Sequence, residues 1–298
     1  MRGPAAGGAF LSEANGVDAI DLVVFDVDGV LVDARDSYNA AARRTVEHVL
    51  GPRDGGWLSD DEMAALRVAG GFNDEWDLAA VAIWAQAGGR RQDLRQLARS
   101  AKSRGGGVAG AVEAGALVQD PPREVVLKAF CEIYAGTAQV EEMYGFGPSL
   151  AEPQEGLWRQ ERRLVEAAEL LLLRAPKAVY TGRTLGELRP TFARFGFGVH
   201  FPENFCLTGD GPYRKPDGRG LRYLGEVAGA AHVLMVGDNV DDFRAVENAR
   251  RIDSSRHYDF CGIEGGALGE LAADVFQDLG VEAVAPSASE LLRWLRGA

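Results

Sequence analysis

Short apolar runs that stop abruptly at polar residues recur along the chain, with helical periodicity between them. These runs predict buried β-strands over residues 20–25, 178–181, 205–208 and 232–237. The intervening segments predict helices over 158–174, from the capping box that begins at Thr184, over 221–229 and over about 242–250. The tail to residue 298 has room for one or two further strand–helix pairs. Alternating strands and helices indicate an α/β fold with a doubly wound, parallel sheet.

The pattern between residues 36 and 156 differs, because it is helical throughout. One face of a first helix is formed by positions spaced three and four apart: Tyr38, Ala41, Ala42, Thr45, Val46 and Val49. Ser59 begins a capping box for a second helix, and Asn73 is expected to cap a third. Two more helices are expected over 90–103 and 122–135, whereas Arg104–Ala116 is Gly-rich and aperiodic, which predicts a mobile loop.

This helical stretch is far too long to be a crossover between two parallel strands. We therefore expect an all-helical domain over 36–156, inserted into a core that comprises 18–35 and 157–298. Residues 1–17 lack the apolar core of a signal peptide and are rich in Gly and Ala. They are expected to form a disordered extension.

Composition limits the partners that the protein can have. A net charge of −12 argues against binding to nucleic acid and to anionic membranes, and no apolar stretch is long enough to span a bilayer. The three cysteines are far apart, which favours reduced thiols in a cytoplasmic protein. The four histidines are scattered without metal-ligand spacing, so core or surface roles are favoured for them. The oligomeric state is not indicated.

Two acidic clusters follow predicted strands, and in doubly wound sheets ligands bind at the carboxyl ends of the strands. Asp26 and Asp28 follow the first strand, where they could share a cation and still leave one carboxylate for proton transfer. A plain turn or helix cap is the alternative. After the strand over 232–237, the carboxylates of Asp238, Asp241 and Asp242 would repel one another unless a cation or a lysine lies among them. Helix capping by one of the last two is the alternative, although it does not account for Asp238.

Two further segments carry groups suited to a phosphate. Thr181, Gly182 and Arg183 close one strand and open a capped helix, so they offer a hydroxyl and free N–H groups. An ordinary strand–turn–helix junction is the alternative. Lys215 precedes Pro216 in a loop, and its compact charge would suit a phosphoryl oxygen. Most loop lysines, however, are simply solvated.

Taken in order, these residues resemble the four motifs of the haloacid-dehalogenase-like superfamily. The matching elements are Asp26-Val-Asp28-Gly-Val30, Thr181 at a strand end, Lys215-Pro216 in a loop, and Gly237-Asp238-Asn-Val-Asp241-Asp242. The resemblance covers residues 20 to about 250. It implies a Rossmann-like core, and the helical insert resembles the C1-type cap of the phosphoglycolate-phosphatase-like branch of subfamily I.

The resemblance implies a role for each matched residue. Asp26 would be the nucleophile and a ligand of Mg²⁺, and Asp28 would be the general acid and base and bind the metal through its backbone carbonyl. Thr181 and the Gly182 N–H would bind the phosphoryl group, and Lys215 would neutralise charge beside it. Asp238 would complete the metal site, with Asp242 supporting a metal-bound water or Lys215. The usual lysine-loop sequence is altered to Lys215-Pro-Asp-Gly218, with Arg214 adjacent.

We therefore expect a Mg²⁺-dependent phosphatase that hydrolyses a small phosphorylated metabolite, such as a sugar phosphate or a phosphoglycolate-like ester, through an aspartyl-phosphate. The alternatives are a phosphomutase that uses the same aspartates and a catalytically idle binding or scaffold protein on the same fold. Dehalogenation is disfavoured, because a second acid such as Asp28 serves to protonate an oxygen leaving group. The motifs do not identify the substrate.

Overall fold

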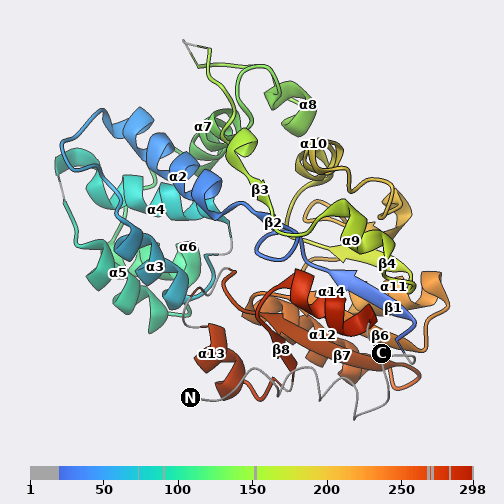
Figure 1. Cartoon of the computed structure of the whole chain (residues 1–298). Helices are drawn as coiled ribbons and strands as arrows, with labels where there is room; N and C mark the ends of the chain where they lie inside the picture. The colour runs from blue at the N-terminus through green and yellow to red at the C-terminus, as the bar shows by residue number, and fades with distance from the viewer. Residues whose placement is uncertain are drawn as a thin grey trace. The chain divides into compact units, whose positions relative to one another are not determined.

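Six parallel strands form the central sheet of the computed structural model, in the order β5-β4-β1-β6-β7-β8 (Figure 1). Their bounds are β1 Leu22–Phe25, β4 Lys177–Tyr180, β5 Cys206–Leu207, β6 His232–Gly237, β7 His257–Ile263 and β8 Ala283–Ala285. The structure describes residues 20–72, 74–89, 91–150, 153–266, 269, 272–281 and 283–296. The expected extension over 1–17 and the expected cap Asn73 lie outside these residues. The predicted doubly wound parallel sheet is confirmed.

The buried strand β1 lies in the middle of the sheet, between β4 and β6. Its Val24 pairs with Ala178 of β4 on one side and with Met235 of β6 on the other. All four residues of β1 and all six of β6 are buried, as expected for a parallel sheet covered on both faces. The helices of this part are α9 Ala167–Leu171, α10 Leu185–Phe195, α11 Gly218–Ala228, α12 Val240–Ile252, α13 Ala272–Asp278 and α14 Ala288–Arg296.

The helix predicted over 158–174 is wrong. This stretch instead contains the 3₁₀ helix η3 Leu157–Gln160, the short strand β3 Arg162–Arg163 and the five-residue helix α9. Strand β3 pairs antiparallel with β2 Val32–Asp33, and Arg162 forms an ion pair with Asp33. The apolar residues near the start and end of the stretch mimic a helical stripe, but tertiary pairing with β2 overrides the local preference.

Helices are the main elements, among the described residues, of a second compact unit, Asp36–Gln160, which is distinct from the unit of residues 1–35 and 161–298. They are α2 Arg35–Leu50, α3 Asp60–Ala69, α4 Glu75–Gln86, α5 Leu94–Lys102, α6 Gly107–Gly115, α7 Arg123–Ala135 and α8 Val140–Tyr144, with the 3₁₀ turn η2 Ala87–Gly89 after α4. Helix α4 is buried on every side from Leu78 to Gln86, so it is the central element of this unit. The capping box at Ser59 is confirmed, and Asp74 is the N-cap residue of α4.

The mobile loop predicted over 104–116 is wrong, because it contains helix α6. Val108 and Val112 pack against the core of the helical unit, and Ala111 is fully buried. A Cβ on Gly110 would lie 2.9 Å from the carbonyl oxygen of Ala101 in α5, so the glycine permits close helix packing. Helix propensity does not predict this helix, because the segment contains many glycines. Burial of its apolar side stabilises it instead.

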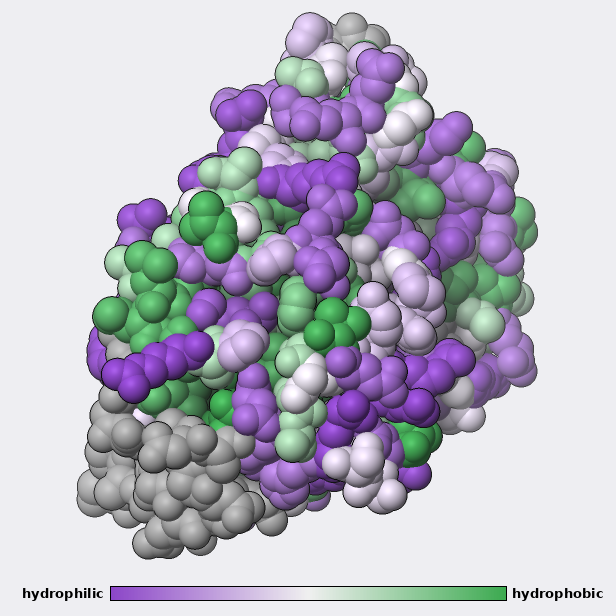
Figure 2. Space-filling model, turned by 90° about the vertical axis from the view of Figure 1, so that its right-hand side faces the viewer, coloured by the Kyte–Doolittle hydropathy of each residue, from purple (hydrophilic) through white to green (hydrophobic). Residues whose placement is uncertain are grey.

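In Figure 2, hydrophilic residues cover most of the face, and hydrophobic residues form separate patches between them. Within the part of the chain that the structure describes, the most exposed large apolar side chains are Val199 and Leu171, at 86% and 71%, and exposed residues of this kind are ordinary on folded proteins. Among the described residues, none of the helices combines the length and the apolar character required to cross a bilayer.

Candidate active site

Three neighbouring strands end next to the residues that the sequence singled out. Asp26 follows β1, Thr181 follows β4 and Asp238 follows β6, and these strands are adjacent in the order β4-β1-β6. Because the carboxyl ends of parallel strands lie at one edge of a sheet, all three residues lie at that edge.

Three buried carboxylates meet there. Asp26, Asp238 and Asp242 each offer an oxygen, and these atoms lie within 4.8 Å of one another. Space for the Asp238 side chain depends on two glycines, because a Cβ at Gly29 or at Gly266 would lie 2.0 Å from Asp238 Oδ2. Gly29 also has a φ of 75°, a conformation that L-residues rarely adopt.

Lys215 bridges two of these carboxylates. Its Nζ lies 2.8 Å from Asp26 Oδ1 and 2.7 Å from Asp242 Oδ1, and all three side chains are buried. Burial lowers the pKa of Lys215, but the carboxylates of Asp242 and Asp26 outweigh this effect and raise the pKa above its ordinary value. The ammonium group therefore remains charged between the two carboxylates.

The charge of Asp26 is not fully compensated by this lysine. Burial, together with the nearby charges of Asp242 and Asp28, raises the pKa of Asp26 to about 7 against the opposing effect of Lys215. Asp26 Oδ1 also accepts a hydrogen bond from the Val27 N–H, at 2.7 Å. A further positive charge at this cluster would favour the anionic form of Asp26.

Asp242 anchors the cluster to helix α12. Its Oδ2 accepts hydrogen bonds from the backbone N–H groups of Asp238 and Asn239, both at 3.2 Å, while its Oδ1 contacts Lys215. Asn239 is the N-cap residue of α12, and Asp242 completes the capping box. The helix-capping alternative therefore holds for Asp242, and the same side chain also orients Lys215.

Asp28 lies outside the three-carboxylate cluster and is held by an arginine. Arg183 Nη2 donates to Asp28 Oδ1 at 2.6 Å, and Arg183 Nε lies 3.0 and 3.1 Å from the two carboxylate oxygens. The guanidinium is fully buried and also contacts Glu161 at 3.1 Å and the Thr191 hydroxyl at 2.8 Å. The Asp28 side chain remains 34% exposed. The carboxylate is thus fixed in orientation while one side stays accessible.

Sequence reasoning missed this role of Arg183. Its only signal is its position in the short turn between a strand and a capped helix, which does not reveal the partners of its side chain. Glu161 lies between η3 and β3, Thr191 lies in α10, and Asp28 comes from the loop after β1.

The predicted phosphate-binding pair follows β4. Thr181 is buried, and its Oγ1 accepts the Arg183 N–H at 3.2 Å, so its hydroxyl proton can still be donated. A Cβ built on Gly182 meets no atom within 4 Å, which leaves open space above this residue. These features suit a bound anion.

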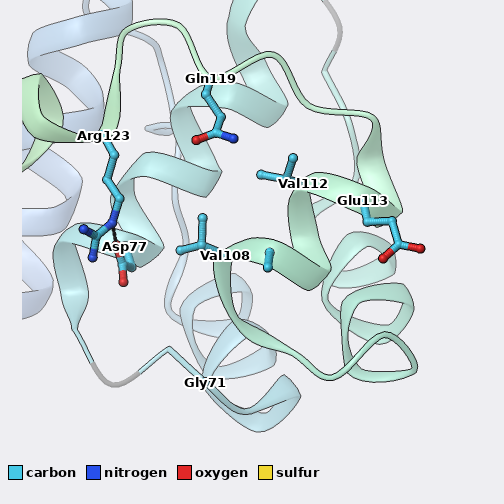
Figure 3. Close-up of a pocket in the computed structure, with 8 residues that line it drawn as sticks. Gly71, Asp77, Val108, Val112, Glu113, Gln119 and Arg123 are labelled. Atoms are coloured by element: carbon cyan, nitrogen blue, oxygen red, sulfur yellow. Dashed lines mark hydrogen bonds and ion pairs between the residues drawn. The ribbon is translucent and has the colours of Figure 1, made fainter.

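A cavity of about 600 Å³ lies within the helical unit (Figure 3). Val108 and Val112 point into it from α6, and the ion pair between Arg123 and Asp77 lies beside them. Glu113, another lining residue, pairs with Arg104 at 3.6 Å. The charges that line this cavity are therefore already paired, and we assign it no part in the chemistry at the strand ends.

Comparison with known proteins shows the family of the chain. The family model of haloacid dehalogenase-like hydrolases matches residues 20–250. The chain belongs to this family. In this hydrolase, the matched span begins just before β1 and ends within α12, so it includes every charged and hydroxyl-bearing residue of the site described above. No curated protein matches the chain.

Solved structures share the fold of this haloacid dehalogenase-like hydrolase. "Phosphatase Tt82" from Thermococcus thioreducens is 26% identical with a TM-score of 0.63, and the match covers 86% of this chain and 99% of that one. A predicted phosphoglycolate phosphatase from Haemophilus somnus 129pt is 15% identical with a TM-score of 0.59, over 92% and 97% of the two chains. A hydrolase of subfamily IA from Geobacter sulfurreducens PCA is 17% identical with a TM-score of 0.52, over 93% and 97%. The expected family and fold are confirmed.

Proposed function

We propose that this hydrolase is a Mg²⁺-dependent phosphatase that acts on a small phosphorylated metabolite through an aspartyl-phosphate on Asp26. The observation that carries the proposal is the buried group of Asp26, Asp238, Asp242 and Lys215 at the carboxyl ends of β1 and β6. The similarity to a phosphatase from Thermococcus thioreducens supports this choice among the reactions of the family.

The donor set fits Mg²⁺. The cluster consists of carboxylate oxygens without imidazole or thiolate, and hard divalent cations prefer such oxygen ligands. Asp26 and Asp238 would bind the ion, together with the Asp28 backbone carbonyl, while Asp242 would keep its contacts with Lys215 and with the N–H groups of Asp238 and Asn239. The ion would neutralise charge on the phosphoryl oxygens and on the carboxylates that face them.

Asp26 would then attack the phosphorus atom. Val27 N–H and Lys215 both bind Asp26 Oδ1, and no described residue donates a hydrogen bond to Oδ2. Oδ2 therefore suits the forming O–P bond as the ester O–P bond breaks in line with it. Lys215 would stabilise the charge that develops between nucleophile and phosphoryl group.

Asp28 would serve both proton transfers. It would donate a proton to the departing ester oxygen and later accept one from the water that hydrolyses the aspartyl-phosphate. The bidentate contact with Arg183 would hold its carboxyl group in one orientation. The Thr181 hydroxyl and the Gly182 N–H would bind the phosphoryl oxygens.

We propose the helical unit, Asp36–Gln160, as the cap that selects the substrate. Every residue to which we assign chemistry lies outside it, so its replacement by a short linker should leave slow hydrolysis of activated esters. Selectivity for the true metabolite should be lost in a folded capless chain, because the cap would recognise the part of the substrate remote from the phosphate. Retained selectivity would assign specificity to core loops.

A panel of phosphate esters assayed with and without Mg²⁺ tests the proposed function. We expect release of inorganic phosphate from p-nitrophenyl phosphate and from one class of small metabolite, with loss of activity in excess chelator. Conversion of a sugar phosphate to its isomer, without phosphate release, would identify a phosphomutase instead. Full activity in chelator would contradict the metal assignment.

A further inference from the structure

Two histidines that are distant in sequence meet at the amino ends of β6 and β7. His232 begins β6, His257 begins β7, and the strand register pairs them directly. His232 Nε2 lies 2.8 Å from Asp259 Oδ2, and His257 Nε2 lies 3.0 Å from Asp259 Oδ1. The two imidazole centroids are 4.6 Å apart. Side chains two residues apart on a strand share a face, so Asp259 lies on the same side as both rings.

We propose that His232, His257 and Asp259 bind a divalent transition-metal ion, with Zn²⁺ the best fit. Two imidazole nitrogens and one carboxylate oxygen form a donor set that suits zinc, and all three donor atoms lie within 4.8 Å of one another. In tetrahedral zinc sites with bonds near 2.0–2.1 Å, neighbouring donors are roughly 3.3 Å apart. The observed separations of 2.8 and 3.0 Å would need to widen by only a few tenths of an ångström.

The backbone holds these donors on regular structure. The Asp21 carboxylate accepts hydrogen bonds from the N–H groups of Ala231 and His232, both at 2.9 Å. The His257 N–H donates to the Ala231 carbonyl at 2.8 Å. Metal ligands carried by paired strands are more precisely placed than ligands on loops, so little ordering would be needed on binding.

Exposure of the cluster permits entry of an ion. The His257 side chain is 54% exposed and that of Asp259 is 28% exposed, whereas that of His232 is 11% exposed. Solvent could therefore supply the remaining ligand. Arg250 opposes binding, because its Nη2 lies 3.5 Å from Asp259 Oδ1 while its Nε donates to the Tyr258 carbonyl. We therefore expect an affinity below that of a site without a neighbouring cation.

This site is independent of the proposed phosphatase centre. His232 is the first residue of the six-residue strand β6, and Asp238 follows its last. At about 3.3 Å per residue, the two ends of the strand are separated by roughly 16 Å. Mg²⁺ would thus bind at the carboxylates and Zn²⁺ at the histidines independently. Competition between the two metals can distinguish the two sites.

Equilibrium dialysis of the full chain without a polyhistidine tag tests the proposal. We expect about one Zn²⁺ per chain to remain bound in millimolar Mg²⁺, with a higher Tm on binding. His257→Ala and Asp259→Asn should each weaken Zn²⁺ binding about tenfold or more, and should abolish the Tm increase. His48→Ala, which changes an exposed histidine of the helical unit, should leave both unchanged.

Co²⁺ gives an independent readout. It should show the visible absorption of a four-coordinate nitrogen–oxygen site in the unaltered chain and in Asp238→Asn, and should lose it in His257→Ala. Equal Zn²⁺ affinity in His257→Ala and the unaltered chain would overturn the proposal, as would the absence of Zn²⁺ binding. Binding that Asp238→Asn removes and His257→Ala retains would assign the ion to the carboxylates instead, and would also overturn it.

Discussion

The two ends of strand β6 carry polar clusters of contrasting character. At the carboxyl end, Lys215 lies between buried carboxylates, and the pKa of Asp26 is raised to about 7 mainly by burial. At the amino end, Asp259 lies between two histidines and near an arginine, with its carboxylate partly exposed. Its pKa is lowered, because these partners outweigh the effect of burial. The first cluster has an excess of buried negative charge that favours a cation, whereas the second satisfies its charges within the protein and would bind a metal through geometry.

The largest expected difference between the two ends is catalytic. Asp26→Asn should abolish hydrolysis and phosphoenzyme formation, because an amide is neither anionic nor nucleophilic. Asp28→Asn should slow turnover by roughly 10²–10⁴-fold, as is typical when a general acid–base group is lost. His257→Ala at the amino end should retain full activity with Mg²⁺. A phosphoenzyme formed by Asp26→Asn would show that the nucleophile is another residue.

Removal of Lys215 should lower the free energy of unfolding, because it leaves buried carboxylates without a cation. Lys215→Met leaves Asp26 and Asp242 without their shared cation, and breaking such a buried pair costs about 3–5 kcal/mol. The loss should be measured by urea unfolding without metal at about pH 8.5, above the pKa of Asp26. It should shrink towards pH 5.5, because protonated Asp26 no longer needs the lysine. The exposed Lys102→Met is the control, and equal stability of the two variants would refute the assigned charge balance.

Arg183 should affect kcat because it orients the Asp28 carboxylate. Arg183→Lys keeps a positive charge but loses the fork that contacts Asp28, Glu161 and Thr191, so kcat should fall by roughly 10–100-fold. KM should change little, because no substrate contact is assigned to this arginine. Arg189→Lys, at an exposed pair with Glu203, should leave kcat unchanged. A rise in KM with unaltered kcat would indicate substrate binding by Arg183 rather than positioning.

Mg²⁺ affinity should depend on pH at the carboxyl end. Because the pKa of Asp26 is raised to about 7 in the metal-free protein, this group carries a proton below that pH, and the proton must leave before the ion binds. Mg²⁺ binding measured by calorimetry should therefore strengthen as pH rises from 6 to 8, by at most about tenfold per unit for one released proton. Above pH 8 it should level off. A flat profile would contradict a raised pKa.

The smallest expected effect is at the amino end without metal. His257→Ala should change the free energy of unfolding by less than about 1 kcal/mol at pH 7, because exposed ion pairs contribute little. The lowered pKa of Asp259 means that its contribution is present above its ordinary value near 4 and is lost as pH falls below it. Urea unfolding at pH 7 and pH 3 checks both statements. A loss of several kcal/mol would mean that the cluster is structural even without an ion.

Local patterns predicted several elements of both units correctly. Strands β1 and β6 follow from apolar runs, and the capping boxes at Ser59 and Thr184 are present as expected. The predictions of a mobile loop over 104–116 and of a helix over 158–174 were wrong. Packing of small residues stabilises α6, and pairing with β2 determines the structure of the second segment. Such contacts join residues distant in sequence, and periodicity does not report them.

The sequence by itself determined which residues follow the strand ends, because a buried strand and the turn after it are encoded by neighbouring positions. Asp26, Thr181 and Asp238 were found in this way, whereas Lys215 was found from the resemblance of its loop to a family motif. Only the tertiary structure decided that Arg183 contacts Asp28 across 155 positions, and that His232 meets Asp259 across 27. The order and register of parallel strands determine which distant side chains share a face, and both depend on long-range burial and hydrogen bonding that no local pattern contains.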